Sequence, residues 1–240
     1  MDLSAYRLVI FDKDGTLIDF DAMWAGWLEQ LAENLHAATG ESWTDSLYVA
    51  MHYDAASRRA VAGGPLAVSP MADMRALTVA VLQARGMATV AADTALAMAW
   101  HAPDPVTTAR PLVDLSHLFR TLRERGLKIA VATSDDHAPT VATLSALGLD
   151  ALVDVVVGAD DGIPIKPEPD MVWEACRSSG VAPGEAIMVG DTVADLQMGR
   201  AAGVGCNVGV TSGVSSAGLL APFADVILPN VGGLITELET

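Results

Sequence analysis

Short apolar runs alternate with stretches of helical periodicity over the second half of the chain, and this alternation restricts the possible folds most strongly. The apolar runs have the length of buried strands and lie at residues 127–133, 153–158, 186–190, 204–208 and 226–228. The helical stretches lie at residues 113–125, 138–147, 168–179 and 192–202. Strict alternation of helices with nearly continuous apolar strands indicates an α/β fold with a Rossmann-like, doubly wound parallel sheet.

One further strand is expected near the N-terminus, where residues 8–11 are all apolar. Asp12 and Asp14 follow this run, and Gly15 and Thr16 then break the strand into a turn. Paired carboxylates at the end of a buried strand are electrostatically unfavourable unless a positive charge lies beside them. A divalent cation is the simplest candidate for that charge.

Between this first strand and the later ones, the sequence predicts only helices. Apolar residues recur at spacings of three and four from Trp24 to Leu35, and further helices are expected at residues 44–53, 70–86 and 90–101. We interpret residues 19–105 as a helical cap domain inserted into a core made of residues 1–18 and 106–240. Trp24 and Trp27 are expected to pack between these helices, with a contact to substrate as the alternative.

Polar residues follow three of the later strands. Because the carboxyl ends of parallel strands lie at one edge of a sheet, these residues are expected beside Asp12 and Asp14. They are Thr133, Ser134, Lys166, Asp191 and, one helical turn later, Asp195. Carboxylates with few other ligand types suit Mg²⁺, and a hydroxyl, a lysine and main-chain N–H groups suit phosphoryl oxygens.

The four polar segments together resemble the motifs of the haloacid dehalogenase (HAD) superfamily. The segments are DKDGTLID from Asp12, the strand that ends in Thr133, the Lys166–Pro167 pair, and GDTVAD, which ends at Asp195. Residues 166–203 further resemble the phosphoglycolate-phosphatase-like members, which carry a helical cap at the same insertion point. The resemblance implies a HAD-like core and a Mg²⁺-dependent phosphatase of small soluble phosphate monoesters, with phosphoglycolate as a candidate substrate.

The resemblance also implies a role for each matched residue. Asp12 would attack phosphorus and form an aspartyl-phosphate, and Asp14 would act as general acid and then as general base. The metal residues would be Asp12, Asp14 through its main-chain carbonyl, Asp191 and Asp195, with a contact through water as the alternative for Asp195. Thr133 and Lys166 would complete the catalytic set by binding the phosphoryl group. The expected substrate-binding residues are Gly15, Thr16, Ser134, Arg58 and Arg59.

Several residues have a simpler structural interpretation. Lys13 departs from the more common apolar residue between the two aspartates, and strand alternation predicts that its side chain points away from them. We favour a surface or ion-pair role for Lys13 over a substrate contact. Asp135 and Asp136 are expected at the N-terminus of the next helix, where they would complement its dipole. Arg58 and Arg59 have solvent exposure as an equal alternative.

Other functions share parts of this pattern. A sugar-phosphate mutase similar to β-phosphoglucomutase would carry the same core motifs and remains an alternative. A phosphate-binding protein without turnover is less favoured, because Asp12, Asp14, Lys166 and Asp191 are all present. Asp14 disfavours a dehalogenase, which needs no second aspartate as acid and base. The predicted cap contains no lysine, which a phosphonoacetaldehyde hydrolase would require.

Composition limits the partners that such a chain is expected to have. The formal net charge of −16 argues against nucleic acid and anionic membranes as partners, because both are bound by basic surfaces. No apolar run reaches the roughly 18 residues of a membrane-spanning helix, and no signal pattern is present, so a cytoplasmic location is expected. With two cysteines, no structural disulfide is expected. We expect a monomer or homodimer that binds a small phosphorylated metabolite.

Overall fold

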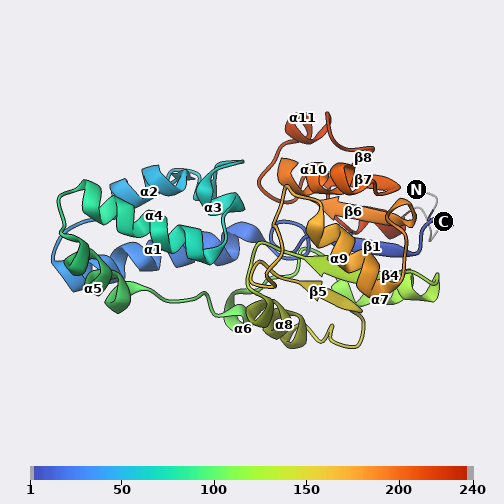
Figure 1. Ribbon diagram of the computed structural model, residues 1–240, viewed down its shortest axis with the longest axis horizontal. Coiled ribbons are helices and arrows are strands. Elements are labelled where there is room, and N and C mark those ends of the chain that lie inside the picture. Colours follow the sequence, from blue (N-terminus) through green and yellow to red (C-terminus); the bar gives the residue numbers. More distant parts are fainter. Residues whose placement is uncertain (1–2, 237–240) are drawn as a thin grey trace. The chain divides into compact units, whose positions relative to one another are not determined.

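The computed structural model describes residues 3–236, and the chain forms two compact units (Figure 1). The sheet unit consists of Met1–Asp19 and Pro105–Thr240, and the helical unit consists of Phe20–Asp104. The boundaries expected from the sequence each lie one residue from these divisions. Residues 1–2 and 237–240 of the predicted core lie outside the described residues, and the cap role of the helical unit stays a prediction.

The sheet unit is built on six parallel strands in the order β5-β4-β1-β6-β7-β8, which confirms the predicted doubly wound sheet. In chain order, β1, β4 and β5 succeed one another from the centre of this sheet to one edge, and β6, β7 and β8 succeed one another from the centre to the other edge. The direction of winding therefore reverses between β1 and β6. In such sheets, ligands bind beyond the carboxyl ends of the strands at this reversal. The strands are β1 (Leu8–Phe11), β4 (Lys128–Ala132), β5 (Val155–Val157), β6 (Ala186–Gly190), β7 (Cys206–Val210) and β8 (Val226–Leu228).

Side chains of the central strands alternate between two helical layers. On one face, Leu8 and Ile10 belong to a buried cluster with residues of α9 (Asp170–Ser179) and α10 (Val193–Ala202). On the other face, Phe11 stacks on Phe119 of α7 (Leu115–Glu124), with 5.4 Å between ring centroids. Cys176 and Cys206 are buried free thiols, as expected. The remaining helices of this unit are α6 (Pro105–Thr108), α8 (His137–Ala146), η1 (Pro183–Glu185), α11 (Ala217–Leu220) and α12 (Gly233–Thr236).

The position of β7 differs from the prediction, which began this strand at residue 204. Gly203 takes the left-handed conformation at the end of α10, and the amide of Val204 donates to the carbonyl of Gly199. These bonds close the helix in the manner of a Schellman turn. Val204 therefore ends the helix, and the strand starts and finishes two residues later than the prediction.

The helical unit packs four longer helices around an aromatic core. Helix α1 (Phe20–Thr39) contacts α2 (Thr44–Met51) and α5 (Thr89–Ala99), and α4 (Met71–Ala84) contacts the same two helices. A short helix, α3 (Pro65–Val68), precedes α4. Trp24, Trp27 and Trp100 form edge-on ring contacts, which bears out the packing role expected for Trp24 and Trp27. None of the helices described between residues 3 and 236 has the length and apolar character needed to cross a membrane.

The helical unit also contains a short antiparallel hairpin, β2 (Tyr53–Asp54) and β3 (Arg59–Ala60), which corrects the prediction that no strand lies in this region. The predicted helix to residue 53 ends at Met51 because His52 takes the left-handed conformation, with φ of 52°. The Asp54 carboxylate then accepts bonds from the next residues and closes the turn. Strands of two residues are too short to show an alternating sequence pattern.

We expect Leu28→Ala to lower the free energy of unfolding of the helical unit by about 3 kcal/mol, because it leaves a cavity among well-packed helices. Leu28 on α1 is fully buried. Urea titration followed by tryptophan fluorescence measures the change, since Trp24, Trp27, Trp43 and Trp100 all lie in this unit. Val90→Ala is the matched control, because Val90 is 78% exposed, and it should change stability by less than about 0.5 kcal/mol. Equal losses for both variants would contradict the expectation.

Candidate active site

Polar side chains from the predicted segments meet at the carboxyl end of the sheet. Asp12 follows β1, Asp191 follows β6, and Asp195 lies in the first turn of α10. One carboxylate oxygen from each of these three residues lies within 4.8 Å of the others, and we call this group the acidic triad. The triad lies at the reversal between β1 and β6, where the fold places its ligand sites.

The acidic triad is buried, and this determines its electrostatics. Burial raises the pKa of Asp12 from 3.8 to about 7, although the Lys166 ammonium acts in the opposite direction. Burial and the neighbouring Asp12 carboxylate raise the pKa of Asp191 well above its usual value. Three like charges in a dry site are therefore costly without enough positive charge to balance them.

Lys166 supplies one balancing charge. Its ammonium donates a hydrogen bond to Asp12 and lies 2.6 Å from Oδ1 of Asp195. Burial alone would lower the pKa of Lys166, but Asp12 and Asp195 outweigh burial and raise it, so Lys166 is charged at neutral pH. Apart from this ion-pair contact, Oδ1 of Asp195 is buried with no hydrogen-bond donor. Oxygen donors in excess of positive charge fit a hard divalent cation.

Asp191 is held between two loops that approach it through glycines. The amide of Val214 donates to Oδ2 of Asp191 at 2.8 Å, and the Thr16 hydroxyl donates to Oδ1 at 3.1 Å. A Cβ atom on Gly15, where φ is +84°, would lie 2.6 Å from Oδ2, and one on Gly213 would overlap the same oxygen. Asp191 is therefore fixed by contacts on both of its oxygens.

Gly15 and Thr16 were predicted to bind substrate, and their described hydrogen bonds instead join them to other residues of the protein. The Thr16 hydroxyl donates to Asp191, and the Gly15 amide donates to the carbonyl of Ile18 at 2.7 Å. The sequence interpretation missed the loop after β7, whose Ser212 hydroxyl donates to the carbonyl of Gly15 at 2.8 Å. This loop could have been found from the sequence, because it is a polar turn directly after a parallel strand. The prediction ended β7 two residues too early, so the turn was not recognised as the end of the strand. Substrate contacts of Gly15 and Thr16 stay predictions.

Asp195 connects the triad to the start of α10. Thr192 is the N-cap residue, and its hydroxyl accepts a bond from the Asp195 amide while Oδ2 of Asp195 accepts from the Thr192 amide at 3.0 Å. This reciprocal capping fixes Asp195 with its second oxygen toward Lys166. Asp195 is fully buried although it lies in the first turn of a helix.

Thr133 and Ser134 follow β4, as predicted. Thr133 is buried, its amide donates to the carbonyl of Val157 at 3.0 Å, and its hydroxyl accepts from the Asp135 amide at 3.2 Å. Ser134 is partly buried. Among the described hydrogen bonds the Thr133 hydroxyl only accepts, and a hydroxyl that donates is what a phosphoryl oxygen requires. Phosphate binding by either hydroxyl stays a prediction.

Comparison with known proteins supports the resemblance seen in the sequence. Residues 6–203 match the profile of the haloacid dehalogenase-like hydrolases. The chain belongs to this family. It is 33% identical over 231 residues to a phosphoglycolate phosphatase from Rhodospirillum rubrum, covering 91% of this chain and 87% of that protein.

A second relative agrees with this assignment, and a solved structure shows the same fold. This HAD-like hydrolase is 38% identical over 94 residues to the pyrophosphatase PpaX of Halalkalibacterium halodurans. The aligned residues cover 39% of this chain and 44% of that protein. A HAD phosphatase structure from Thermococcus onnurineus superposes with a TM-score of 0.69 at 21% identity, covering 97% of each chain, and shows the common fold. The family and these relatives establish the chain as a phosphatase.

The structure corrects the direction predicted for the Lys13 side chain in this HAD-like hydrolase and adds a contact for Asp135. Lys13 is 1% exposed and points toward the carboxylate of Asp14, not away from it, while the ion-pair part of the prediction is confirmed. Strand alternation fails here because β1 ends at Phe11. Asp135 and Asp136 directly precede the next helix, as predicted, with Asp136 as its N-cap residue, and the Asp135 carboxylate also lies 2.8 Å from the Lys13 ammonium.

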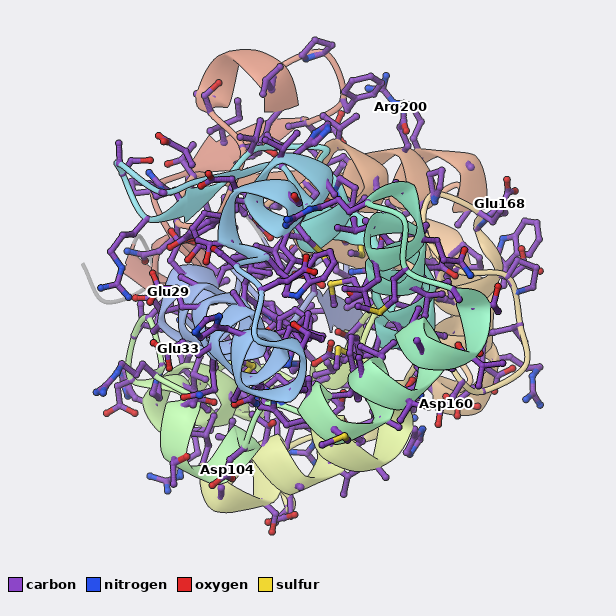
Figure 2. The ribbon with its side chains drawn as sticks, turned by 90° about the vertical axis from the view of Figure 1, so that its left-hand side faces the viewer. Glu29, Glu33, Asp104, Asp160, Glu168 and Arg200 are labelled. Atoms are coloured by element: carbon purple, nitrogen blue, oxygen red, sulfur yellow. The ribbon has the colours of Figure 1, made fainter. Side chains whose placement is uncertain are left out.

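The two arginines predicted to bind substrate are paired inside the helical unit of this hydrolase. Arg58 lies 2.6 Å from Glu29, which projects from α1 and is labelled in Figure 2. The Arg59 Nε atom lies 3.1 Å from Asp21 at the start of the same helix. Both arginine side chains are more than half exposed. A substrate contact for Arg58 or Arg59 stays a prediction.

Proposed function

We propose that this phosphatase hydrolyses a small phosphate monoester through a phosphoaspartate on Asp12, with Mg²⁺ as cofactor and phosphoglycolate as the first candidate substrate. The observation that carries the proposal is the buried Asp12 carboxylate, bonded to Lys166 within the acidic triad. The phosphoglycolate phosphatase relative from R. rubrum, aligned over 91% of this chain, supports the candidate substrate. The proposal includes the cap role for Phe20–Asp104 and a cytoplasmic location.

In the first step, an oxygen of Asp12 attacks phosphorus and the bond from phosphorus to the ester oxygen breaks. Asp14 gives its proton to the departing oxygen, so that a neutral alcohol leaves. Lys166 balances the charge on Asp12 and on the phosphoryl group, and Thr133 donates its hydroxyl to a phosphoryl oxygen. In the second step, water attacks the phosphoaspartate while Asp14 takes a proton from it. Inorganic phosphate leaves and the Asp12 carboxylate returns.

The acidic triad, together with the main-chain carbonyl of Asp14, would hold Mg²⁺ in this proposal. When bound, the ion supplies the positive charge that lets a carboxylate and a phosphate approach each other. The oxygen-only donor set, the burial of the triad and the excess of negative charge over Lys166 support this assignment.

Phosphate release from a panel of small phosphate esters, with Mg²⁺ or with EDTA, tests the function directly. Wild-type enzyme is expected to release phosphate only with the metal, with Asp12→Asn as the inactive control. If the wild-type enzyme releases phosphate from none of the esters in the panel, the proposal is overturned. Conversion of a sugar 1-phosphate to its 6-phosphate would instead support the mutase alternative.

We expect the metal-free enzyme to become less stable as the pH rises from 3.8 to about 7. The folded state keeps a proton on Asp12, whose pKa is about 7, and on Asp191, whose pKa is raised, after the unfolded chain has lost these protons. Unfolding therefore releases protons in this window, and the free energy of unfolding falls with pH. Mg²⁺ competes with these protons, so it should raise Tm more at pH 8 than at pH 5.

Calorimetry with Mg²⁺ or EDTA at both pH values measures this difference. At a concentration 100 times its dissociation constant, the ion should stabilise the fold by about 2.7 kcal/mol at pH 8. Asp191→Asn should remove most of the shift, and KCl at matched ionic strength should not reproduce it. Equal shifts at both pH values would count against binding at the triad.

A further inference from the structure

Lys13 is a buried lysine that contacts no member of the acidic triad in any described hydrogen bond or ion pair. Its ammonium donates to both carboxylate oxygens of Asp14, at 2.9 and 2.8 Å, and lies 2.8 Å from Oδ2 of Asp135. Burial alone would lower the pKa of Lys13, but Asp14 and Asp135 outweigh burial and raise it, so the side chain is charged. Its three N–H groups are thus directed at two carboxylates from different loops.

Asp135 is itself held firmly by its backbone. Its amide donates to the Thr133 hydroxyl, and its carbonyl accepts from the amide of Ala159 at 2.8 Å. The loop after β4 is thereby tied to the loop after β5, and Lys13 extends this connection to Asp14. Asp14 itself keeps 12% of its side-chain surface exposed, so Lys13 anchors it without burying it completely.

We propose that Lys13 and Asp135 form a positioning pair that holds the Asp14 carboxylate in the orientation needed for proton transfer. The inference rests on the proposed function, in which Asp14 is the acid and then the base. In the described contacts, Lys13 bonds Asp14 and Asp135, and neither Lys13 nor Asp135 pairs with the nucleophile Asp12, so both act through Asp14. A short aspartate side chain rotates readily unless its oxygens are held, and a small misplacement of a catalytic group costs orders of magnitude in rate. Bonds from Lys13 to both oxygens, with Asp135 holding the ammonium from the far side, restrict that rotation.

The dependence of rate on the leaving group separates this role from a purely structural one. An alkyl phosphate needs a proton on its departing oxygen, whereas 4-nitrophenolate leaves as a stable anion without one. In Lys13→Met we expect kcat for an alkyl phosphate to fall about 10²-fold, with KM changed by less than about threefold. The first turnover of 4-nitrophenyl phosphate, followed by stopped-flow absorbance, should change by less than about threefold. A slow steady state should follow that burst, because Asp14 also activates the water.

Two further variants complete the experiment. Asp135→Asn removes one charge but keeps an acceptor for Lys13, and it should reduce the alkyl phosphate rate about tenfold with the same leaving-group dependence. Lys128→Met is the matched control, because the Lys128 ammonium donates to the carbonyl of Ser179 at 2.6 Å from the opposite end of the sheet. It should leave both rates unchanged.

The outcomes distinguish this inference from the proposed function. If Lys13→Met and Asp135→Asn each lower the alkyl phosphate kcat and the first 4-nitrophenyl phosphate turnover by the same factor, or lower neither rate, the positioning role is overturned while the phosphatase proposal stays intact. A Lys13→Met protein that fails to fold leaves Asp135→Asn to decide. If wild-type enzyme released phosphate from neither ester, the proposed function itself would be wrong.

Discussion

Asp12→Asn is expected to lower kcat for phosphate ester hydrolysis by at least about 10³-fold, because an amide oxygen is a poor nucleophile for phosphorus. The substitution keeps the shape of the side chain and an acceptor for Lys166. The metal-free variant should be as stable as wild type or more stable at pH 8, because one charge is removed from the buried acidic triad. Activity and stability are thus expected to move in opposite directions.

Steady-state phosphate release and thermal unfolding in EDTA measure the two effects on one preparation. Mass spectrometry of the variant excludes slow conversion of the asparagine back to aspartate, which would restore activity artificially. A verified Asp12→Asn protein with kcat within tenfold of wild type would show that Asp12 is not the nucleophile.

Lys166→Met is expected to lower the free energy of unfolding by about 3 kcal/mol at pH 8 in EDTA, because buried carboxylates lose their paired cation. The Lys166 ammonium contacts both Asp12 and Asp195. Among the described ion pairs, no other cation pairs with either of these two carboxylates. At pH 5 the loss should be smaller, because an unpaired buried carboxyl group takes up a proton instead of remaining charged. Activity should also fall steeply, since Asp12 loses the bond that orients it.

Urea titrations at pH 5 and pH 8 test this pH dependence. Lys128→Met serves as the control, because its ammonium bonds a carbonyl and contributes no charge to the triad. We expect the control to lose no more than about 1 kcal/mol at either pH. A loss for Lys166→Met that is the same at both pH values would argue that packing, and not charge, accounts for its contribution.

The sequence was sufficient for those site residues whose positions follow from topology. Asp12 and Asp191 come directly after apolar strands, and a parallel sheet brings such residues to one edge. Lys166 stood out because the chain has only three lysines. Family resemblance then suggested the roles, which spacing alone does not give and which stay proposals.

The residues that sequence reasoning misplaced depend on where an element ends. Lys13 was assigned a direction by strand alternation, but β1 had already ended, and the turn points its side chain at Asp14. The loop at Gly213 was missed because the close of α10 delays the start of β7. Helix and strand ends depend on capping and on tertiary hydrogen bonds, which a periodic pattern does not encode.

The two glycines that face Asp191 have a consequence for redesigning this enzyme. Gly15 and Gly213 come from opposite ends of the chain, yet each leaves the space that one carboxylate occupies. A library that randomises the loop after β7 would therefore lose most of its members through displacement of Asp191. Such a library should keep Gly213 invariant and vary only its neighbours.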